Sequence, residues 1–458
     1  MTSEANAEST PPTAAPGYGA GTIHPRRDSD VVRLVSELIR IDTTNPGDNS
    51  GPGEIEAARW VAAQLAEVGI TAELFTTTAS HRAGVAALLQ GTDANLPPLL
   101  LTGHLDVVPA VDSGWTHPPF SGHIDDEGVI WGRGAVDMKN MVGMILAVMR
   151  EWQLTNFTPR RSIALLFTPD EEAGGHHGAH WIVKNRPDLL QGATDAIGEV
   201  GGFSMDLPNG ARIYPVQTGE KGLAWITATV PGTAGHGSLL QSDSPVAKLV
   251  TALNTLATHP YDVELTPAMQ QLVDTVSALV GEPLALDDQA RLAEQVGSFA
   301  RVLGACVRTT INPTMLNAGV KHNVVPNQAS AGLDVRFLPG TQEAVLDHIT
   351  EVMPAGTTFE FANLDIALET DFDGDVIAAI VAALAAVDPT AKVVPYLMTG
   401  GTDGKAFSTL GVRYFGFSPL LLSPGAEFWS MFHGVDERVP SSGLVFGTGV
   451  LDDVLRRL

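Results

Sequence analysis

The sequence predicts an α/β fold in which a mostly parallel sheet carries helices on both of its faces. Short, continuous apolar runs of the kind found in buried parallel strands alternate with helical segments along the first half of the chain. Polar residues follow directly after these runs. Because a chain of 458 residues is too long for one ordinary core, we expect two domains.

The first 200 residues are expected to contain three helices and three buried strands. Apolar residues at helical spacing predict the helices, and short apolar runs predict the strands. The helices are expected at 31–41, 55–68 and 138–152, and the strands at 99–101, 162–167 and 193–197.

The pattern changes after Gly219. Residues 222–230 and 328–337 alternate in hydropathy as half-buried strands do, and a helix is expected between them at 245–257. We therefore expect a smaller α+β domain, residues 219–339, inserted into a larger domain that comprises 28–218 and 340–458. The elements expected after Gly340 are helices at 342–352, 375–387, 403–410 and 442–458 and strands at 392–394 and 412–417.

The two chain regions with unusual composition bear on localisation. Residues 1–27 are expected to form a disordered tail, because the first part is rich in Ala, Thr, Ser, Pro and Gly and lacks the basic start and apolar core of a secretory signal. The longest apolar stretch, 376–387, is too short to span a membrane. We expect a cytoplasmic protein.

Charge and cysteine content exclude several functions. The formal net charge of −25 argues against binding to nucleic acid or to an anionic membrane surface. The single cysteine, Cys306, excludes a disulfide within the chain and a cysteine-rich zinc site. Any metal would therefore bind to His, Asp and Glu.

Residues of these three types gather where ligands bind in α/β proteins, at the carboxyl ends of the predicted strands. The candidates after the strands are His104, Asp106, Asp170, Glu171, Glu172 and Glu199, with Asp137 in a glycine-rich loop and His433 near the C-terminus. Each alone has an ordinary explanation, such as a helix start for adjacent acids. Three apolar strands that all end in such residues indicate a metal site, and imidazole and carboxylate without thiolate suit zinc, cobalt or manganese.

The sequence resembles the dinuclear zinc peptidases and deacylases, a family that includes acetylornithine deacetylase, succinyl-diaminopimelate desuccinylase, glutamate carboxypeptidase and aminoacylase. The resemblance extends from about residue 30 to the C-terminus. The matching blocks, in the order of the family, are GHLDVVP (103–109), GRGAVDMK (132–139), PDEEAGG (169–175), GHGS (235–238), NVVP (323–326), DVRFLPG (334–340), GGTDGK (400–405) and the segment around His433.

The resemblance implies two divalent metal ions, most simply zinc, with cobalt or manganese as alternatives. It makes Asp137 the carboxylate shared by both ions, with His104 and Glu199 on one ion and Glu172 and His433 on the other. It makes Glu171 the general base that positions a hydroxide shared by the metals.

The resemblance also implies roles for residues around the metal ions. Asp106 is expected to hold the imidazole of His104 in place, and His236, in the inserted domain, to stabilise the oxyanion across a dimer or by closure of that domain. Asn323, Arg336, Gly401 and Thr402 match positions around the substrate's carboxylate. Relatives include homodimers paired through the inserted lid or dimerisation domain and also monomers, so both states stay open.

One departure from the family concerns the loop after the third strand. It reads Gly-Glu-Val-Gly-Gly at 198–202, where many members have Asn-Glu-Gly-Gly. The acidic residue, Glu199, is retained, which favours carboxypeptidases and deacylases over aminopeptidase-like relatives.

The predicted function is hydrolysis of the amide bond of a small peptide or an N-acyl amino acid by a metal-dependent enzyme. Hydrolysis of N-carbamoyl amino acids on the same scaffold is one alternative, and a non-catalytic binding protein with the same fold is another. A serine hydrolase is excluded, since no Gly-x-Ser-x-Gly sequence follows a predicted strand.

Overall fold

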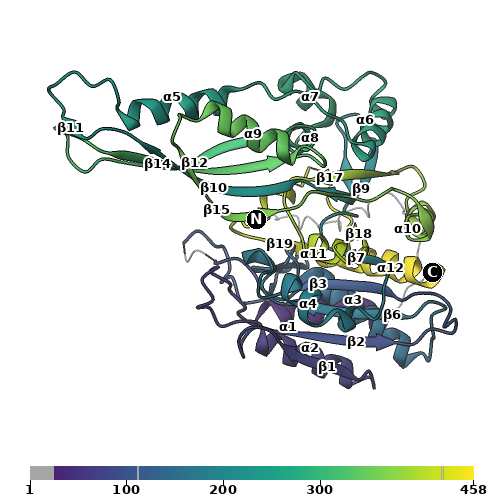
Figure 1. Ribbon diagram of the computed structural model, residues 1–458. Helices are drawn as coiled ribbons and strands as arrows, with labels where there is room; N and C mark the ends of the chain where they lie inside the picture. Colours follow the sequence, from purple (N-terminus) through teal and green to yellow (C-terminus); the bar gives the residue numbers. More distant parts are fainter. Residues whose placement is uncertain (1–24, 111–112, 424, 427) are drawn as a thin grey trace, which may run out of the picture.

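A computed structural model of the chain describes residues 25–110, 113–423, 425–426 and 428–458 (Figure 1). Most of the predicted tail, residues 1–24, lies outside the described residues. Its last three residues are helical, because helix α1 begins at Pro25. The buried side chain of Arg27 anchors this helix: its Nη1 lies 2.7 Å from Asp452 near the C-terminus. No helix of the described part is both long and apolar enough to cross a membrane.

A ten-stranded sheet forms the centre of the larger body. Its inner strands β6, β3, β7 and β18 are parallel to one another, as the apolar runs predicted. Along the sheet the strands follow the order β1 (Ala72–Thr76), β2 (Ala83–Leu89), β6 (Ile163–Thr168), β3 (Leu99–His104), β7 (Asp195–Gly198), β18 (Arg413–Gly416), β9 (Arg212–Glu220) and β16 (Leu368–Glu369), while β8 (Met205–Asp206) and β17 (Lys392–Met398) also pair with β9.

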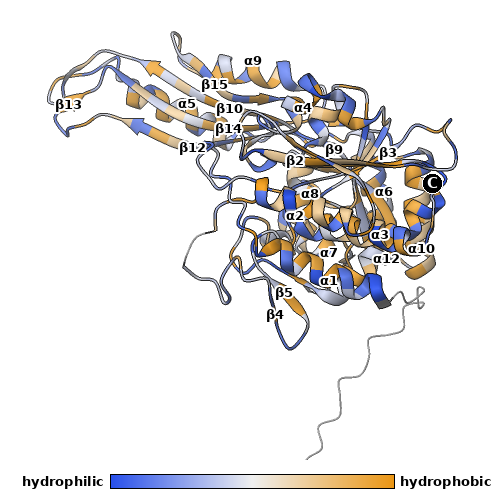
Figure 2. Ribbon diagram, turned by 90° about the horizontal axis from the view of Figure 1, so that it is seen from below, coloured by the Kyte–Doolittle hydropathy of each residue, from blue (hydrophilic) through white to orange (hydrophobic). Residues whose placement is uncertain are grey.

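Helices cover both faces of this sheet, as predicted (Figure 2). Because side chains alternate along a strand, Leu99 and Leu101 of β3 enter one core and Leu100 enters the other. The first core is closed by α1 (Pro25–Ile39), α2 (Ile55–Ala66), α3 (Lys139–Leu154), α10 (Gly374–Val387) and α12 (Ser441–Arg457), and the second by α4 (Ala179–Asn185) and α11 (Gly404–Ser408).

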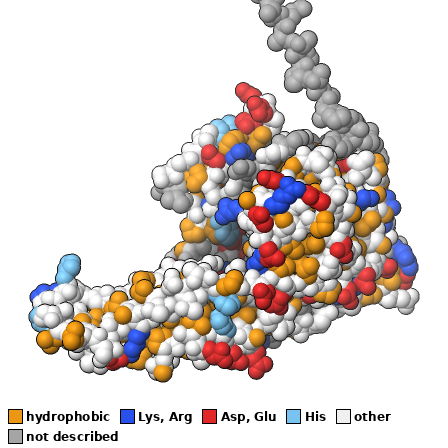
Figure 3. Space-filling model, turned by 90° about the horizontal axis from the view of Figure 1, so that it is seen from above, with side chains coloured by type: hydrophobic (Ala, Val, Ile, Leu, Met, Phe, Trp, Pro, Cys, Tyr) orange, Lys and Arg blue, Asp and Glu red, His pale blue; other side chains and the backbone are white. Residues whose placement is uncertain are grey.

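A second sheet extends away from the larger body as an arm (Figures 1 and 3). Its four strands are antiparallel, in the order β12 (Thr310–Ala318), β14 (Gln328–Phe337), β10 (Gly222–Pro231) and β15 (Thr358–Asp365). Helices α5 (Pro245–Thr258) and α9 (Gln342–Val352) pack on one face. At the far end of the arm, β11 (Gly235–His236) pairs with β13 (Val324–Val325).

This smaller sheet continues past the predicted boundary at residue 339. Strand β15 pairs with the open edge of β10, and Val345 and Ile349 of α9 are buried in the core of the smaller sheet. The α/β pattern therefore does not resume at residue 340, because α9 and β15 complete the arm first. The assignment of 219–339 as a domain stays a prediction.

The segment between α5 and β12 returns to the larger body. Its helices α6 (Pro267–Val280), α7 (Gln289–Val296) and α8 (Phe299–Cys306) form a core with β9 and β17. Met269, Leu303 and Cys306 are fully buried there. The arm is thus tied to the larger body by helices that lie between its own strands in the sequence.

The remaining short elements are a small sheet and several 3₁₀ turns. A three-stranded sheet has the order β19 (Arg438–Pro440), β5 (Val129–Trp131) and β4 (His123–Ile124). Single 3₁₀ turns lie at Glu171–Ala173, Pro187–Leu190 and Phe428–Ser430.

Truncation of a residue at the centre of the large sheet is expected to destabilise the protein strongly. Leu165 of β6 is fully buried, so Leu165→Ala should lower the free energy of unfolding by about 2–5 kcal/mol. Leu410→Ala, at a position 48% exposed, is the matched control and should change it by no more than about 0.5 kcal/mol. Urea denaturation followed by circular dichroism measures both, and equal effects would contradict the assigned core.

Candidate metal centre

The candidate residues gather at the carboxyl ends of three neighbouring parallel strands. His104 is the last residue of β3, Glu171 follows β6, and Glu199 follows β7 directly. In the parallel register, His104 lies opposite Thr168, the last residue of β6. The topology therefore brings together side chains that are far apart in the sequence, as is usual for sites in α/β folds.

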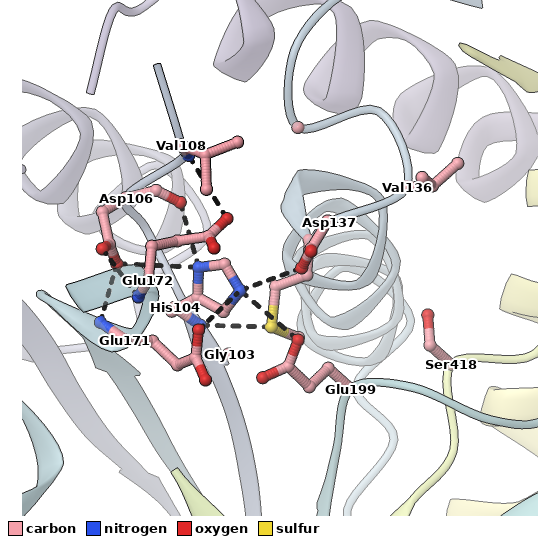
Figure 4. A network of polar contacts seen from close by, with 12 residues as sticks. Gly103, His104, Asp106, Val108, Val136, Asp137, Glu171, Glu172, Glu199 and Ser418 are labelled. Atoms are coloured by element: carbon pink, nitrogen blue, oxygen red, sulfur yellow. Dashed lines mark hydrogen bonds and ion pairs between the residues drawn. The ribbon is translucent and has the colours of Figure 1, made fainter. Parts of the chain in front are cut away.

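His104, Asp137 and Glu199 form the first half of the centre (Figure 4). The Nε2 atom of His104 lies 3.2 Å from Oδ1 of Asp137 and 3.4 Å from Oε2 of Glu199. Its Nδ1 atom lies 2.9 Å from the backbone carbonyl oxygen of Asp106. Since a carbonyl only accepts hydrogen bonds, Nδ1 donates, and the lone pair of Nε2 points at the two carboxylates.

His433 and Glu172 form the second half on the other side of Asp137. The Nε2 atom of His433 lies 3.3 Å from Oδ2 of Asp137 and 3.0 Å from Oε2 of Glu172. The two oxygens of Asp137 therefore face two different imidazoles. A carboxylate in this position can bind one metal with each oxygen.

Glu171 lies beside the first half. One of its carboxylate oxygens lies 3.9 Å from Nε2 of His104, and its ligand atom lies within 4.8 Å of those of His104 and Glu199. The distances alone are compatible with a ligand or with a base next to the ligands.

The electrostatics of this cluster favour a bound cation. Burial, followed by repulsion from Glu199, raises the pKa of Glu171 well above its usual range. Burial and Asp137 raise the pKa of Glu172, and burial raises the pKa of Glu199 to about 8. Burial also opposes ionisation of Asp137, but hydrogen bonds with His104 and His433 hold its pKa below the usual range. Carboxylates crowded in this way ionise together only when positive charge compensates them.

The donor set therefore fits two divalent cations. Two imidazoles and three carboxylates converge, and no thiolate takes part, which suits zinc, cobalt or manganese. Each half supplies one imidazole and one carboxylate in addition to the shared Asp137.

Asp106 contacts both His104 and the turn that carries the adjacent acids. Its carboxylate Oδ1 lies 3.6 Å from Nδ1 of His104, which the backbone carbonyl of Asp106 contacts more closely. The carboxylate instead accepts the backbone N–H groups of Glu171 and Glu172, at 3.1 Å each, and a hydrogen bond from Asn45. Asp106 thus fixes the turn that carries the adjacent acids, because the N-terminus of that turn leaves its N–H groups free.

Glu437 holds the loop of Asp137, a contribution that the sequence did not reveal. Its fully buried carboxylate accepts the backbone N–H groups of Gly134, Val136 and Asp137 at 2.7–3.0 Å. It also pairs with Arg133 at 2.9 Å. The motif spacing carries no signal for this contact, since the partners are about 300 residues apart.

A cavity of about 350 Å³ opens above the centre. One wall is apolar and aromatic, and strands of both sheets and the segment before His433 contribute to it. This wall consists of Leu223, Trp225, Met398, Trp429 and Phe432. Three of the predicted substrate residues, Arg336, Gly401 and Thr402, line the same cavity.

Two of these three residues already have close partners. The Nε and Nη2 atoms of Arg336 lie 2.6 and 3.2 Å from the two carboxylate oxygens of Asp334. Thr402 donates its hydroxyl to the buried carboxylate of Glu220 at 2.5 Å. The Nε–Nη2 edge of the Arg336 guanidinium therefore faces Asp334.

His236 and Asn323 lie away from the cavity, at the far end of the arm (Figure 1). Both side chains are exposed, and neither residue lines the cavity. His236 contacts Ser238 through Nδ1 at 2.8 Å, and the backbone N–H of Gly237 donates to the carbonyl of Asn323. The structure thus does not bring these two predicted residues to the centre of their own chain.

Comparisons with known proteins show the family and agree with this fold. The model of peptidase family M20/M25/M40 matches residues 100–457. A carboxypeptidase S-like protein of Dictyostelium discoideum is 32% identical over 76% of this chain and 69% of its own length. Aminoacylase-1 of Sus scrofa is 28% identical over 93% of this chain and 95% of its own length. The solved structure of an M20 family metallo-carboxypeptidase from Sulfolobus solfataricus shares the fold, with a TM-score of 0.71, 19% identity, and coverage of 93% of this chain and 98% of that chain.

Removal of the Glu437 carboxylate is expected to weaken metal binding without touching a ligand. Glu437→Ala frees the loop of Asp137, so the affinity for zinc should fall about 10–100-fold. Competition with a chromophoric chelator measures it. Glu127→Ala, which removes an exposed acid, is the control and should bind zinc normally. Unchanged affinity in Glu437→Ala would contradict the assigned role.

Proposed function

The chain belongs to peptidase family M20/M25/M40, and on this premise we propose that it hydrolyses the amide bond of N-acyl amino acids or small peptides with a free carboxylate. The activities named for its relatives, an aminoacylase and carboxypeptidases, support this substrate range. The position of Asp137 between two imidazoles carries the proposal.

In this proposal five side chains hold two divalent metal ions. His104 and Glu199 would bind one ion, Glu172 and His433 the other, and Asp137 both. When bound, such a pair of ions activates water near neutral pH and polarises the carbonyl of the scissile amide. Zinc is the simplest choice for this donor set, and cobalt and manganese fit it too.

Glu171 is the proposed general base and acid. Its backbone is held by Asp106, while its carboxylate lies 3.9 Å from the imidazole of His104, farther than the carboxylates of Asp137 and Glu199. It would take a proton from the attacking water and deliver that proton to the departing nitrogen. The adjacent acids Glu171 and Glu172 would thus have distinct roles.

The apolar wall bears on the choice among acyl groups. Phe432 directly precedes His433, Trp429 lies four residues before it, and both line the same cavity. This wall favours an acyl group or peptide side chain with apolar surface, which gains free energy from burial. A carbamoyl group is small and polar, so N-carbamoyl amino acids fit this wall less well.

His236 and the arm suggest a second copy of the chain. Exposed apolar side chains gather on β12 and at the end of the arm, where a monomer would rarely leave them (Figure 3). They are Leu239, Leu240, Met315, Leu316, Val320 and Val324. Strand β12 is also an open edge that a partner strand could extend. We place His236 at the oxyanion of the partner's site, within a homodimer paired through the arm.

Replacement of the general base should separate chemistry from metal binding. Glu171→Ala is expected to lower kcat for an N-acetyl amino acid by at least about 10²–10⁴-fold, while metal analysis still finds two ions per chain. Glu351→Ala, an exposed acid on α9, is the matched control with normal turnover. Loss of metal from Glu171→Ala, or retained activity, would refute this role.

Mixing of two inactive variants tests whether His236 acts across a dimer. Glu171→Ala and His236→Ala chains are each expected to be nearly inactive. A mixed dimer would contain one site with an intact Glu171 and an intact His236 from the partner chain, so activity should reappear on co-refolding. Absence of recovery in a confirmed mixed dimer, or a monomeric protein in sedimentation, would contradict the proposal.

A further inference from the structure

The carboxylate of Glu171 depends on its backbone for its position. Among the residues that the structure describes, this carboxylate forms no hydrogen bond, and Nε2 of His104 lies 3.9 Å from it. The adjacent Glu172 differs, because Val108 donates its backbone N–H to one carboxylate oxygen at 3.3 Å, and Nε2 of His433 lies 3.0 Å from the other (Figure 4). The backbone turn that carries both acids therefore matters more for the proposed base than for the proposed ligand.

Two buried carboxylates hold this turn. Asp106 accepts the backbone N–H groups of Glu171 and Glu172. Asp170 begins the turn in a left-handed backbone conformation (φ 68°), and its Oδ2 atom accepts the backbone N–H of His177 at 2.7 Å. Both Asp106 and Asp170 are buried. Because buried charges of like sign repel each other strongly, the turn needs a donor that both carboxylates can share.

The side-chain amide of Asn45 lies between these two carboxylates. Its Nδ2 atom lies 2.9 Å from Oδ2 of Asp106 and 3.1 Å from Oδ1 of Asp170, so the amide donates one hydrogen to each. Its Oδ1 atom accepts hydrogen bonds from Nη2 of Arg82 at 2.8 Å and from the backbone N–H of Gly47 at 3.1 Å. These contacts fix the orientation of the amide, since a flipped amide would place donor against donor and acceptor against acceptor.

Arg82 anchors this amide and brings positive charge to it. The guanidinium is buried and uses a different nitrogen for each of three partners: Nη2 for Asn45, Nε for Asn49 at 2.8 Å and Nη1 for Glu54 at 2.5 Å. Its Nη2 atom also lies 3.7 Å from the carboxylate of Asp170. A lysine has one nitrogen and could not make this set of bonds.

We propose that Asn45, oriented by Arg82, is a positioning residue that holds Glu171 at the attacking water. It acts through Asp106 and Asp170 rather than by contact with the substrate. This inference rests on the proposed function and deepens it, since it names what sets the place of the base. Loss of the amide would leave two buried carboxylates without their shared donor, and the turn would move to separate them. A displacement of about 1 Å is enough to lower a rate about 100-fold.

A purely structural role is the competing explanation. The segment that contains Asn45 runs beside the residues after β3: Thr44 forms a parallel bridge with Val107, and the backbone N–H of Asn45 donates to the carbonyl of Val107 at 2.9 Å. The side chain of Asn45 could merely attach this segment to the sheet. Its loss would then lower stability, while the activity of each folded, zinc-loaded chain would stay the same.

A double-mutant cycle with the proposed base separates the two explanations. In Asn45→Ala, kcat for an N-acetyl amino acid should fall about 10–100-fold, while KM stays within about threefold and metal analysis still finds two zinc ions per chain. Because Asn45 acts through Glu171, the double variant Asn45→Ala/Glu171→Ala should be no slower than Glu171→Ala alone.

Asn49→Gly is the matched control. It removes another partner of Arg82, at a position whose φ of 64° glycine tolerates, and leaves the contacts of Asn45 in place. Its kcat should stay within about twofold of the wild type.

The inference is wrong if Asn45→Ala keeps the wild-type kcat per zinc-loaded chain, or if its loss multiplies with that of Glu171→Ala in the double variant. Loss of zinc from Asn45→Ala would also contradict it, because Glu172 would then be the residue that moves. If Asn45→Ala fails to fold, Arg82→Lys decides: kcat should fall at least about threefold with normal zinc content, and an unchanged kcat refutes the inference. A wild type that hydrolyses neither N-acetyl amino acids nor dipeptides refutes the proposed function itself, and this inference with it.

Discussion

Several carboxylates lie close together in a buried cluster and repel one another. The surrounding structure depends on how this negative charge is compensated. The adjacent Glu171 and Glu172 follow the parallel strand β6, Glu199 follows β7, and Asp137 comes from the loop between β5 and α3. In a medium of low dielectric constant such groups resist simultaneous ionisation, which is why burial raises the pKa of Glu199 to about 8. Two imidazoles offset part of the repulsion, and two divalent cations would remove the rest.

Residues outside the donor set determine the geometry of this cluster. Asp106 and Glu437 each accept backbone N–H groups of the loops that present the acids. Asp106 and Glu437 act in the same way, since each buried carboxylate accepts backbone N–H groups that would otherwise need another acceptor. The arm closes the cavity from the other side, where Trp225 and Arg336 line it. The centre is thus held by the larger body, while both bodies form the walls around the substrate.

The elements that could be predicted from the sequence are those with a characteristic pattern of apolar residues within the element itself. The buried strands β3 and β6 are continuous apolar runs, and their polar ends were expected to meet. Strands β1, β2, β9 and β15 were not predicted. The partners of β2, β9 and β15 are distant in sequence, and β1 pairs with the unpredicted β2. Family motifs selected the residues around Asp137, but the contacts of Glu437 and Asn45 depend on tertiary structure alone. The reverse holds for His236. A sequence motif suggests its chemical role, but the fold of a single chain does not bring it to the metal centre.

Anomalous diffraction from crystals of the zinc-loaded protein tests the central claim most directly. We expect two peaks roughly 3.5–4 Å apart, with one oxygen of Asp137 bound to each, His104 and Glu199 on the first and Glu172 and His433 on the second. A single peak, or two peaks that do not share Asp137, would contradict it.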